Sequence, residues 1–174
     1  MKVVLVFDQG LAGAGGKSNP NVELTAVKGG IGSALMLEPH FKKINANVLA
    51  TLYCGNEYYL QHKEEVTKKM SAMVNKLNPD FVVCGPCFNF EDYADMAANI
   101  SSYINEHTSI KSCAMMSIEN KDVINEFKDK TLIVKMPKKG GTGLNDSITN
   151  LCMLMESSVL NKTDLEEVKT KVCY

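Results

Sequence analysis

The sequence predicts an α/β fold: a three-layer, Rossmann- or flavodoxin-like parallel sheet of about five strands, flanked by helices on both faces. Three observations predict it. Short β-branched runs alternate with longer amphipathic segments along the chain, as in successive β–α units. The chain has 174 residues, of which 45% are hydrophobic, so one domain can bury a core. We find no internal repeat, low-complexity tract or linker, so residues 1–174 are expected to form a single domain.

Each element follows from a local pattern. The strands are expected where short β-branched or apolar runs occur, at residues 3–7, 47–53, 81–84, 111–116 and 131–135. The helices are expected in the amphipathic segments at 31–44, 57–77, 91–106, 120–127 and 144–160, and in a last charged segment from Thr163. Residues 9–30 form a long glycine-punctuated loop in this prediction. Asn78-Pro79 ends the second helix, and Thr163 with Glu166 predicts a capping box at the last one.

Charge and hydropathy exclude several classes of partner. The formal net charge is −1 and the pI is about 6.3, so there is no electrostatic footprint for nucleic acid or an anionic membrane. The longest apolar run is far below the roughly 20 residues that a membrane span needs. Residues 1–8 begin as a strand, and not as a charged segment followed by a long apolar one. We therefore expect no signal peptide, no nucleic-acid or membrane partner, and a cytoplasmic location.

The chain has six cysteines, which are expected to be reduced in the cytoplasm. A zinc site would need a second close pair of cysteines, or histidines at ligand spacing. The histidines at positions 40, 62 and 107 are scattered, so we expect no metal. Cys113 and Cys152 fall inside an expected strand and helix and are interpreted as inert core residues. Cys173 lies next to the last residue and is expected to be exposed.

The loops that follow the strands are the candidate functional site. Parallel α/β sheets bind ligands beyond the carboxyl ends of their strands. The corresponding segments of this chain are residues 8–16, 54–56, 84–89, 117–120 and 137–145. We expect them to meet at one edge of the sheet.

The segment Cys84-Gly85-Pro86-Cys87 carries the strongest chemical signal among these loops. It lies between a buried strand and a helix, and a helix N-terminus favours the thiolate form. Cys84 and Cys87 are therefore the candidate catalytic thiols if they face solvent. If they face the core, they are two small apolar residues. The same tetrapeptide occurs in thioredoxin-like oxidoreductases, but two β–α units precede it here and the chain has no Trp.

Two glycine-rich loops have patterns that can indicate binding of a cofactor or of an anion. Residues 10–16 follow the first strand, but the G-x-G-x-x-G spacing into a helix is missing, because residues 17–20 interrupt it. We therefore expect no nicotinamide cofactor, and no other cofactor; the loop is either a mobile surface loop or a lid. Residues 138–143 place two lysines and three glycines before a helix, which is either an anion site or an ordinary turn.

Several polar residues just after the strands have competing interpretations. Asn89 either orients a substrate or caps the third helix. Glu57, Glu91 and Asp92 lie where acidic side chains stabilise a helix dipole, which is the interpretation we favour.

At these loops the chain resembles the substrate-specific selenoprotein B of glycine, sarcosine and betaine reductases. The matching stretches are residues 3–16, residues 50–59, residues 78–89 with Tyr93, and weakly residues 116–120. The most specific blocks are Cys54-Gly55-Asn56-Glu57-Tyr58 after a strand, and a Pro-Asp-x-x-x-x-Gly-Pro-x-Phe-Asn block that starts at Pro79. The resemblance covers about the first two-thirds of the chain and corresponds to the N-terminal half of the family.

The resemblance implies a cytoplasmic, anaerobic reductase that acts on a small amine. In the family, an activated selenol displaces the amine and passes a carboxymethyl group to a second selenoprotein, with reducing equivalents from thioredoxin. Three departures limit the transfer. The selenocysteine belongs to a C-terminal half that this chain does not contain, Lys17-Ser18 replaces the acids expected after Gly16, and Cys84 and Cys87 replace residues that are usually apolar.

The resemblance and the loop positions together suggest a substrate pocket. Its expected lining residues share a position just beyond a strand end, and they are Gln9, Gly13, Gly15, Gly16, Cys54, Asn56, Phe88, Asn89, Glu119 and Asn120. The leading hypothesis is a thiol-dependent reductase subunit acting on a small amine or amino acid, with other reductase subunits and thioredoxin as partners. The alternative is a non-catalytic binding or assembly subunit of a reductase complex. We also expect the chain to form a homo-oligomer.

Overall fold

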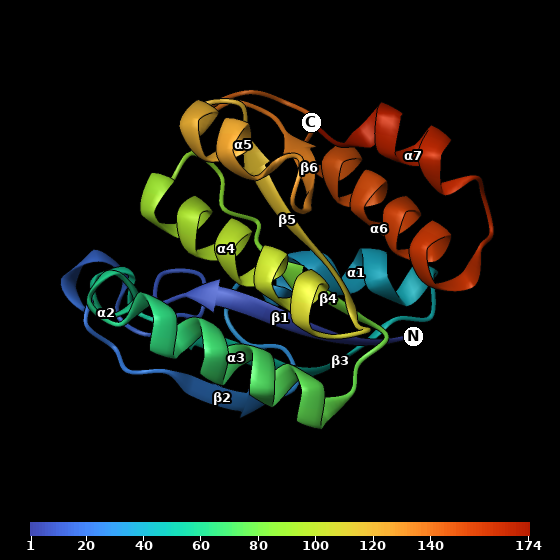
Figure 1. The fold of residues 1–174 in the computed structure, drawn as a ribbon. Coiled ribbons are helices and arrows are strands. Elements are labelled where there is room, and N and C mark those ends of the chain that lie inside the picture. The colour runs from blue at the N-terminus through green and yellow to red at the C-terminus, as the bar shows by residue number, and fades with distance from the viewer.

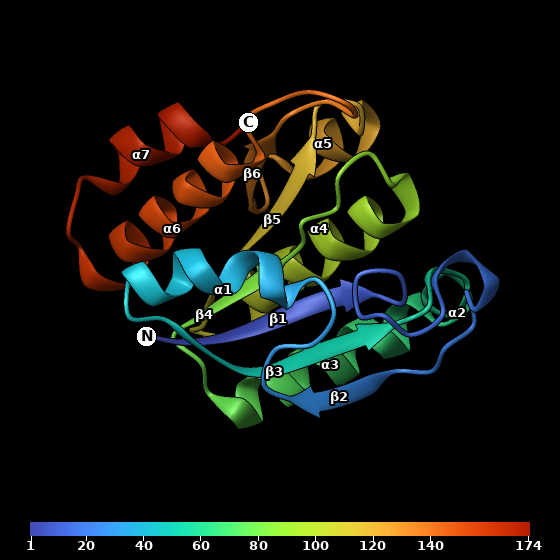
Figure 2. The ribbon, with the colours of Figure 1, turned by 180° about the vertical axis from the view of Figure 1, so that it is seen from behind.

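The computed structural model describes residues 1–174, apart from the side chain of Lys17. Its centre is a six-stranded sheet with the strand order β2-β3-β1-β4-β5-β6 (Figures 1 and 2). The strands are β1 (Lys2–Asp8), β2 (Thr25–Lys28), β3 (Asn47–Cys54), β4 (Phe81–Cys84), β5 (Lys111–Ser117) and β6 (Leu132–Met136). The predicted α/β fold with a mostly parallel sheet is confirmed.

Helices cover both faces of the sheet. They are α1 (Ala34–Lys43), α2 (Asn56–Gln61), α3 (Lys63–Leu77), α4 (Glu91–His107), α5 (Lys121–Phe127), α6 (Leu144–Leu160) and α7 (Leu165–Val172). Figure 1 shows α3, α4 and α5 in front of the sheet, and Figure 2 shows α1 and α6 on the opposite face, with α7 beside α6. None of the helices in the described part of the chain is long and apolar enough to cross a membrane.

The strand directions bring five loops to one edge. β1 pairs in parallel with β3 and β4, and β4, β5 and β6 continue in parallel. The register places Asp8 opposite Cys54 at the ends of β1 and β3. After β3 the chain crosses to the other side of β1 to form β4, so the connections diverge between β1 and β4. Such a switch point leaves a crevice outside the carboxyl ends of the strands.

Three local predictions were wrong. Residues 9–30 contain β2, an edge strand that pairs antiparallel with β3 and is only half buried, so its apolar signal is weak. The helix expected over 57–77 is two helices, because His62 has a non-helical backbone (φ −128°, ψ 31°). Asp164 is the N-cap of the last helix: its Oδ1 accepts from the Glu167 N–H at 3.0 Å, whereas the Thr163 hydroxyl contacts Ser157.

The central strands are enclosed on both faces. Residues 3–7 of β1 and residues 81–84 of β4 are fully buried. Burial of each such apolar side chain stabilises the fold by about 1.5–3 kcal/mol, and parallel sheets covered by helices show this continuous apolar pattern. The strand ends, and the loops that leave them, are therefore held by the best-packed part of the molecule.

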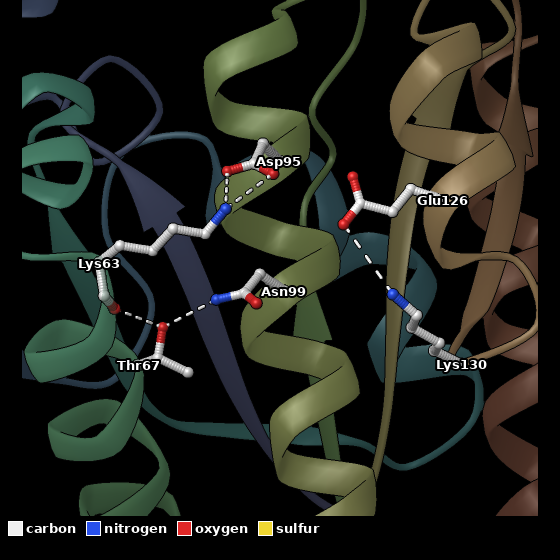
Figure 3. A network of polar contacts seen from close by, with 6 residues as sticks. All are labelled: Lys63, Thr67, Asp95, Asn99, Glu126 and Lys130. Carbon is white, nitrogen blue, oxygen red and sulfur yellow. Dashed lines mark hydrogen bonds and ion pairs between the residues drawn. The ribbon is translucent and has the colours of Figure 1, made fainter.

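A polar network joins α3 to α4 (Figure 3). The Lys63 ammonium pairs with the Asp95 carboxylate at 2.9 Å. The Asn99 amide donates to the Thr67 hydroxyl at 2.9 Å, and that hydroxyl donates to the Lys63 carbonyl at 2.7 Å. Because α4 begins at the carboxyl edge of the sheet, the network also fixes the helix that borders the site. The Glu126–Lys130 pair in the same view is separate from this network and joins Glu126 of α5 to the turn that follows the helix.

Candidate functional site

A cleft of about 590 Å³ opens at the switch point between β1 and β4. The loops after β1, β3 and β4 and the start of α4 surround it. Its lining residues are Asp8, Gln9, Gly10, Leu11, Gly16, Pro20, Asn56, Glu57, Asn89, Phe90, Glu91 and Asp92. The position is the one expected for a ligand site in a parallel α/β sheet.

Asp8 is the last residue of the central strand and is only 5% exposed. Its Oδ1 atom accepts from the Leu11 N–H at 2.7 Å. Burial raises the pKa of the Asp8 carboxyl above its ordinary 3.8, although hydrogen bonds from Leu11, the Asn56 side chain and Gly10 oppose the shift. A buried carboxyl in a cleft with a perturbed pKa marks a candidate functional group.

Gln9 and Asn56 connect the loops after β1 and β3. The Gln9 Oε1 atom accepts from the backbone N–H of Asn56 at 3.1 Å, and Gln9 is 4% exposed. The Asn56 Oδ1 atom is buried and has no hydrogen-bond partner in the described part of the chain. Buried polar atoms are normally satisfied, so this acceptor at the cleft is an exception that calls for a donor.

Carboxylates form the rim of the cleft. Glu91 and Asp92 occupy the first turn of α4, and Glu57 the first turn of α2. The Glu57 Oε2 atom accepts from the Asn21 amide at 2.9 Å. The helix-dipole interpretation of these three acids fits their positions, and all three also line one cavity. Among the described lining side chains none is cationic, so the cleft suits a positively charged group.

The chain segment before α2 closes one side of the cleft. The Pro20 carbonyl accepts from the Glu57 and Tyr58 N–H groups at 3.0 and 3.2 Å, and so caps the start of α2. Gly55 donates to the Val22 carbonyl at 2.7 Å. A Cβ atom at Gly55 would collide with the Pro20 carbonyl, which explains why glycine is required there.

The structure brings four of the residues expected in the pocket to the cleft: Gln9, Gly16, Asn56 and Asn89. Gly13 and Gly15 do not line it. They shape the loop instead, with φ values of 74° and 108° that favour glycine. The loop is held by backbone bonds from Ala12 to the Asp8 carbonyl at 3.0 Å and from Ala14 to the Gln9 carbonyl at 2.8 Å.

Glu119 and Asn120 also lie outside the cleft, although they are at the same edge of the sheet. The Asn120 amide donates to the Phe88 carbonyl at 2.7 Å and to the Ser117 carbonyl at 3.2 Å. The Glu119 carboxylate accepts from the Ser117 hydroxyl at 2.8 Å and from the Lys139 N–H at 2.9 Å. Both side chains fasten neighbouring loops together, so in this structure they position the rim.

A second cavity of about 380 Å³ lies on the other side of Asn89 and Phe90. Phe88 lines this cavity together with the loop before α6, which includes Lys138, Lys139 and Gly140. The Gly141 N–H donates to the Lys138 carbonyl at 2.8 Å, which is a turn geometry. The two cavities therefore share one wall and differ in the sign of their nearby charges.

Cys84 and Cys87 are in the core. Both are fully buried and unpaired. The Cys87 Sγ atom contacts the backbone carbonyls of Cys84 and Tyr93, each at 3.9 Å. Burial raises the pKa of both thiols, so the lowering expected from the helix dipole is overturned. In this conformation they are small core residues, and a catalytic role for the pair stays a prediction.

Two further cysteine predictions differ from the structure. Cys54 does not line the cleft: its thiol donates to the Met96 sulfur at 3.5 Å, and burial and Asp8 raise its pKa to about 12. Cys173 is buried, contrary to expectation, because the C-terminal residues bridge to Val134 of β6. The core assignments of Cys113 and Cys152 are confirmed.

Sequence reasoning did not single out Asp8, which is the central group of the cleft. The sequence does contain a pattern that indicates it, because Asp8 is a charged residue that directly follows the first apolar run, residues 3–7. A carboxylate at the carboxyl end of a central parallel strand is a stronger signal than the glycines that follow it.

The fold and the cleft define the class of the molecule: a doubly wound α/β structure with an acidic cleft at its switch point. The chain matches the family of glycine/sarcosine/betaine reductase selenoprotein B over residues 1–172. It belongs to this family, as the resemblance in the loop motifs predicted.

Individual relatives agree with this assignment. The chain is 30% identical to the sarcosine reductase complex component B subunit beta of Peptoclostridium acidaminophilum, over 76% of this chain and 30% of the relative. It is 26% identical to the glycine reductase complex component B subunit gamma of Carboxydothermus hydrogenoformans, over 88% of this chain and 34% of the relative. It is 23% identical to the betaine reductase complex component B subunit beta of Peptoclostridium acidaminophilum, over 76% and 30%.

The chain therefore spans about a third of the length of the relatives it matches. No solved structure matches it.

Proposed function

We propose that this chain is the amine-binding part of a reductase of the glycine, sarcosine or betaine type, and that it works in the cytoplasm. In this proposal the cleft holds the ammonium group of a small amine or amino acid. The observation that carries it is the Asp8 carboxyl, which is 5% exposed, ends the central strand and lines a cleft rimmed by carboxylates. Family membership supports the class of reaction.

Calorimetric titration tests the proposal. Glycine, sarcosine and betaine are titrated into the 174-residue chain and into its Asp8→Asn variant. At least one amine should bind, and the variant should bind it roughly tenfold to a hundredfold more weakly, because a hydrogen bond to a charged group is removed. Asp129→Asn is the matched control, since Asp129 is exposed and lies outside the cleft. Absence of binding by all three amines would contradict the proposal.

A second candidate is thiol-dependent reduction by Cys84 and Cys87, supplied with electrons by thioredoxin. One observation favours it: Cys87 belongs to the loop between β4 and α4, and Asn89 and Phe90 of the same loop line the cleft. The loop between β4 and α4 would have to open to expose it.

The Cys84→Ser/Cys87→Ser double variant tests this candidate. Amine-dependent turnover with a dithiol reductant should disappear in the double variant and persist in Cys152→Ser, which alters a thiol far from the pair in sequence. Unchanged turnover in the double variant removes the candidate and leaves the binding role alone.

The burial of all six cysteines favours the non-catalytic alternative, in which other subunits of a reductase complex supply the reactive group. The chain spans about a third of its relatives, whose names place them in reductase complexes. Purification from the native host checks this: a homo-oligomer that contains no other subunit would count against it.

A further inference from the structure

Asn56, which lines the cleft, carries a hydrogen-bond acceptor that no part of the described chain satisfies. The Asn56 Oδ1 atom is buried and unpartnered. Asp8, which is 5% exposed, lines the same cleft. The Asp8 Oδ1 atom already accepts from Leu11. A ligand that fits this floor must therefore bring N–H or O–H donors, because a buried acceptor without a donor is destabilising.

The cleft lacks the features that recognise a quaternary ammonium group. Such groups are held by the faces of several aromatic rings. Phe90 is the one aromatic ring among the described lining residues, and it is 44% exposed at the rim. Polar acceptors, and not ring faces, therefore make up the floor.

We propose that the cleft selects ammonium groups that still carry N–H bonds, primary or secondary, and rejects quaternary ones. The inference rests on the proposed function, because it concerns the substrate class of the same site. A primary or secondary ammonium directs one N–H to the Asp8 carboxylate and another to the Asn56 Oδ1 atom. A trimethylammonium group brings only methyl groups, so it donates no hydrogen bond to the Asp8 carboxylate and leaves the Asn56 Oδ1 atom without a donor. Sites built to hydrogen-bond an N–H discriminate strongly against analogues that lack it.

A methylation series of one amino acid tests the inference. Glycine, sarcosine, N,N-dimethylglycine and betaine share their carboxylate and their positive charge, and lose one N–H at each step. We expect the dissociation constant, measured by calorimetry on the 174-residue chain, to be similar for the first two. It should rise for the dimethyl compound, and be at least about tenfold higher for betaine than for sarcosine.

The outcomes separate the inference from the proposed function. If all four compounds bind alike, or betaine binds most tightly, and Asp8→Asn weakens them, the ammonium site stands and its N–H selectivity is overturned. If none binds, both are overturned. If binding decreases along the series and Asp8→Asn weakens it, both are supported.

Asn56→Ala provides a second, independent readout. The variant removes the unpartnered acceptor, so the ratio of the betaine to the sarcosine dissociation constant should shrink by about tenfold, towards one. Asn75→Ala, an exposed asparagine on α3 outside the cleft, is the matched control and should keep the wild-type ratio. An unchanged ratio in a folded Asn56→Ala protein would contradict the assigned role of this acceptor, and circular dichroism establishes that the variant is folded.

Discussion

At the scale of single residues, burial raises the pKa values of two side chains that end neighbouring strands, Asp8 of β1 and Cys54 of β3. Desolvation raises the pKa of the Asp8 carboxyl, and together with Asp8 it raises the pKa of the Cys54 thiol to about 12. The raised pKa keeps the Cys54 thiol protonated, and a protonated thiol is a poor nucleophile. A buried carboxylate with a raised pKa is instead stabilised when a cation binds beside it, because the opposite charge offsets the cost of desolvation.

The pH dependence of amine binding follows from the Asp8 shift. Only the ionised carboxylate attracts an ammonium group, and its pKa is raised above 3.8. Affinity should therefore be highest above this raised pKa and fall as the pH decreases through it. Calorimetry at a series of pH values checks the direction. In Asp8→Asn the remaining affinity should lose this component, and an unaltered profile in the variant would assign the titration to another group.

Among elements, the contact between α3 and α4 controls the position of the rim. Thr67 is 4% exposed and is the link between the Asn99 amide and the Lys63 carbonyl (Figure 3). The neighbouring Lys63–Asp95 pair is partly exposed, with side-chain exposures of 45% and 22%, so it contributes at most about 1 kcal/mol. Most of the specific polar stabilisation of this contact therefore passes through Thr67.

Thr67→Val should lower the free energy of unfolding by about 1–2 kcal/mol, because the Asn99 amide loses its acceptor while the side-chain volume is kept. Urea denaturation measures it. Thr170→Val on α7 removes an exposed hydroxyl that bonds only within its own helix, so it should cost less than about 0.5 kcal/mol. Equal losses in the two variants would show that the α3–α4 network adds nothing.

The junction of β3 and α2 is equally specific. Gly55→Ala should destabilise the fold by about 2 kcal/mol or more, because the new methyl group meets the Pro20 carbonyl and its backbone must shift. Gly10→Ala serves as the comparison, since its Cβ would make an ordinary 3.4 Å contact with the Asp8 Oδ1 atom. Thermal unfolding of both variants checks the difference, and a Gly55→Ala protein as stable as Gly10→Ala would contradict the packing described here.

For the whole molecule, the distribution of thiols gives a direct test of the fold. All six cysteines are buried and unpaired. A disulfide reagent should therefore label the native protein slowly, at a rate limited by local unfolding. In denaturant, the same reagent should label all six thiols rapidly. Mass mapping of the labelled peptides identifies each site. Fast labelling of Cys84 and Cys87 in the native protein would instead support the reactive dithiol.

The parallel strands could be predicted from the sequence, because each is a continuous apolar run that can be recognised from its own residues without knowing which strand it pairs with. The edge strand β2 was missed for the opposite reason: Thr25 and Lys28 become a strand only through pairing with β3. Within the site, the rule that ligands bind beyond the carboxyl ends of parallel strands located the loops. It could not predict the direction in which each side chain points. Asn56 and Asn89 reach the cleft, whereas Asn120 turns to the Phe88 carbonyl, a choice made by tertiary hydrogen bonds.

The Pro20 carbonyl that caps α2 has a consequence for variation among related proteins. The segment between Gln9 and Pro20 is anchored at both ends, by the Gln9 bond to Asn56 and by the Pro20 cap. Insertions or deletions between these anchors would enlarge or shrink the mouth of the cleft without disturbing the helix that carries Asn56. We expect loop length in this stretch to be where related proteins adapt to bulkier or slimmer ligands.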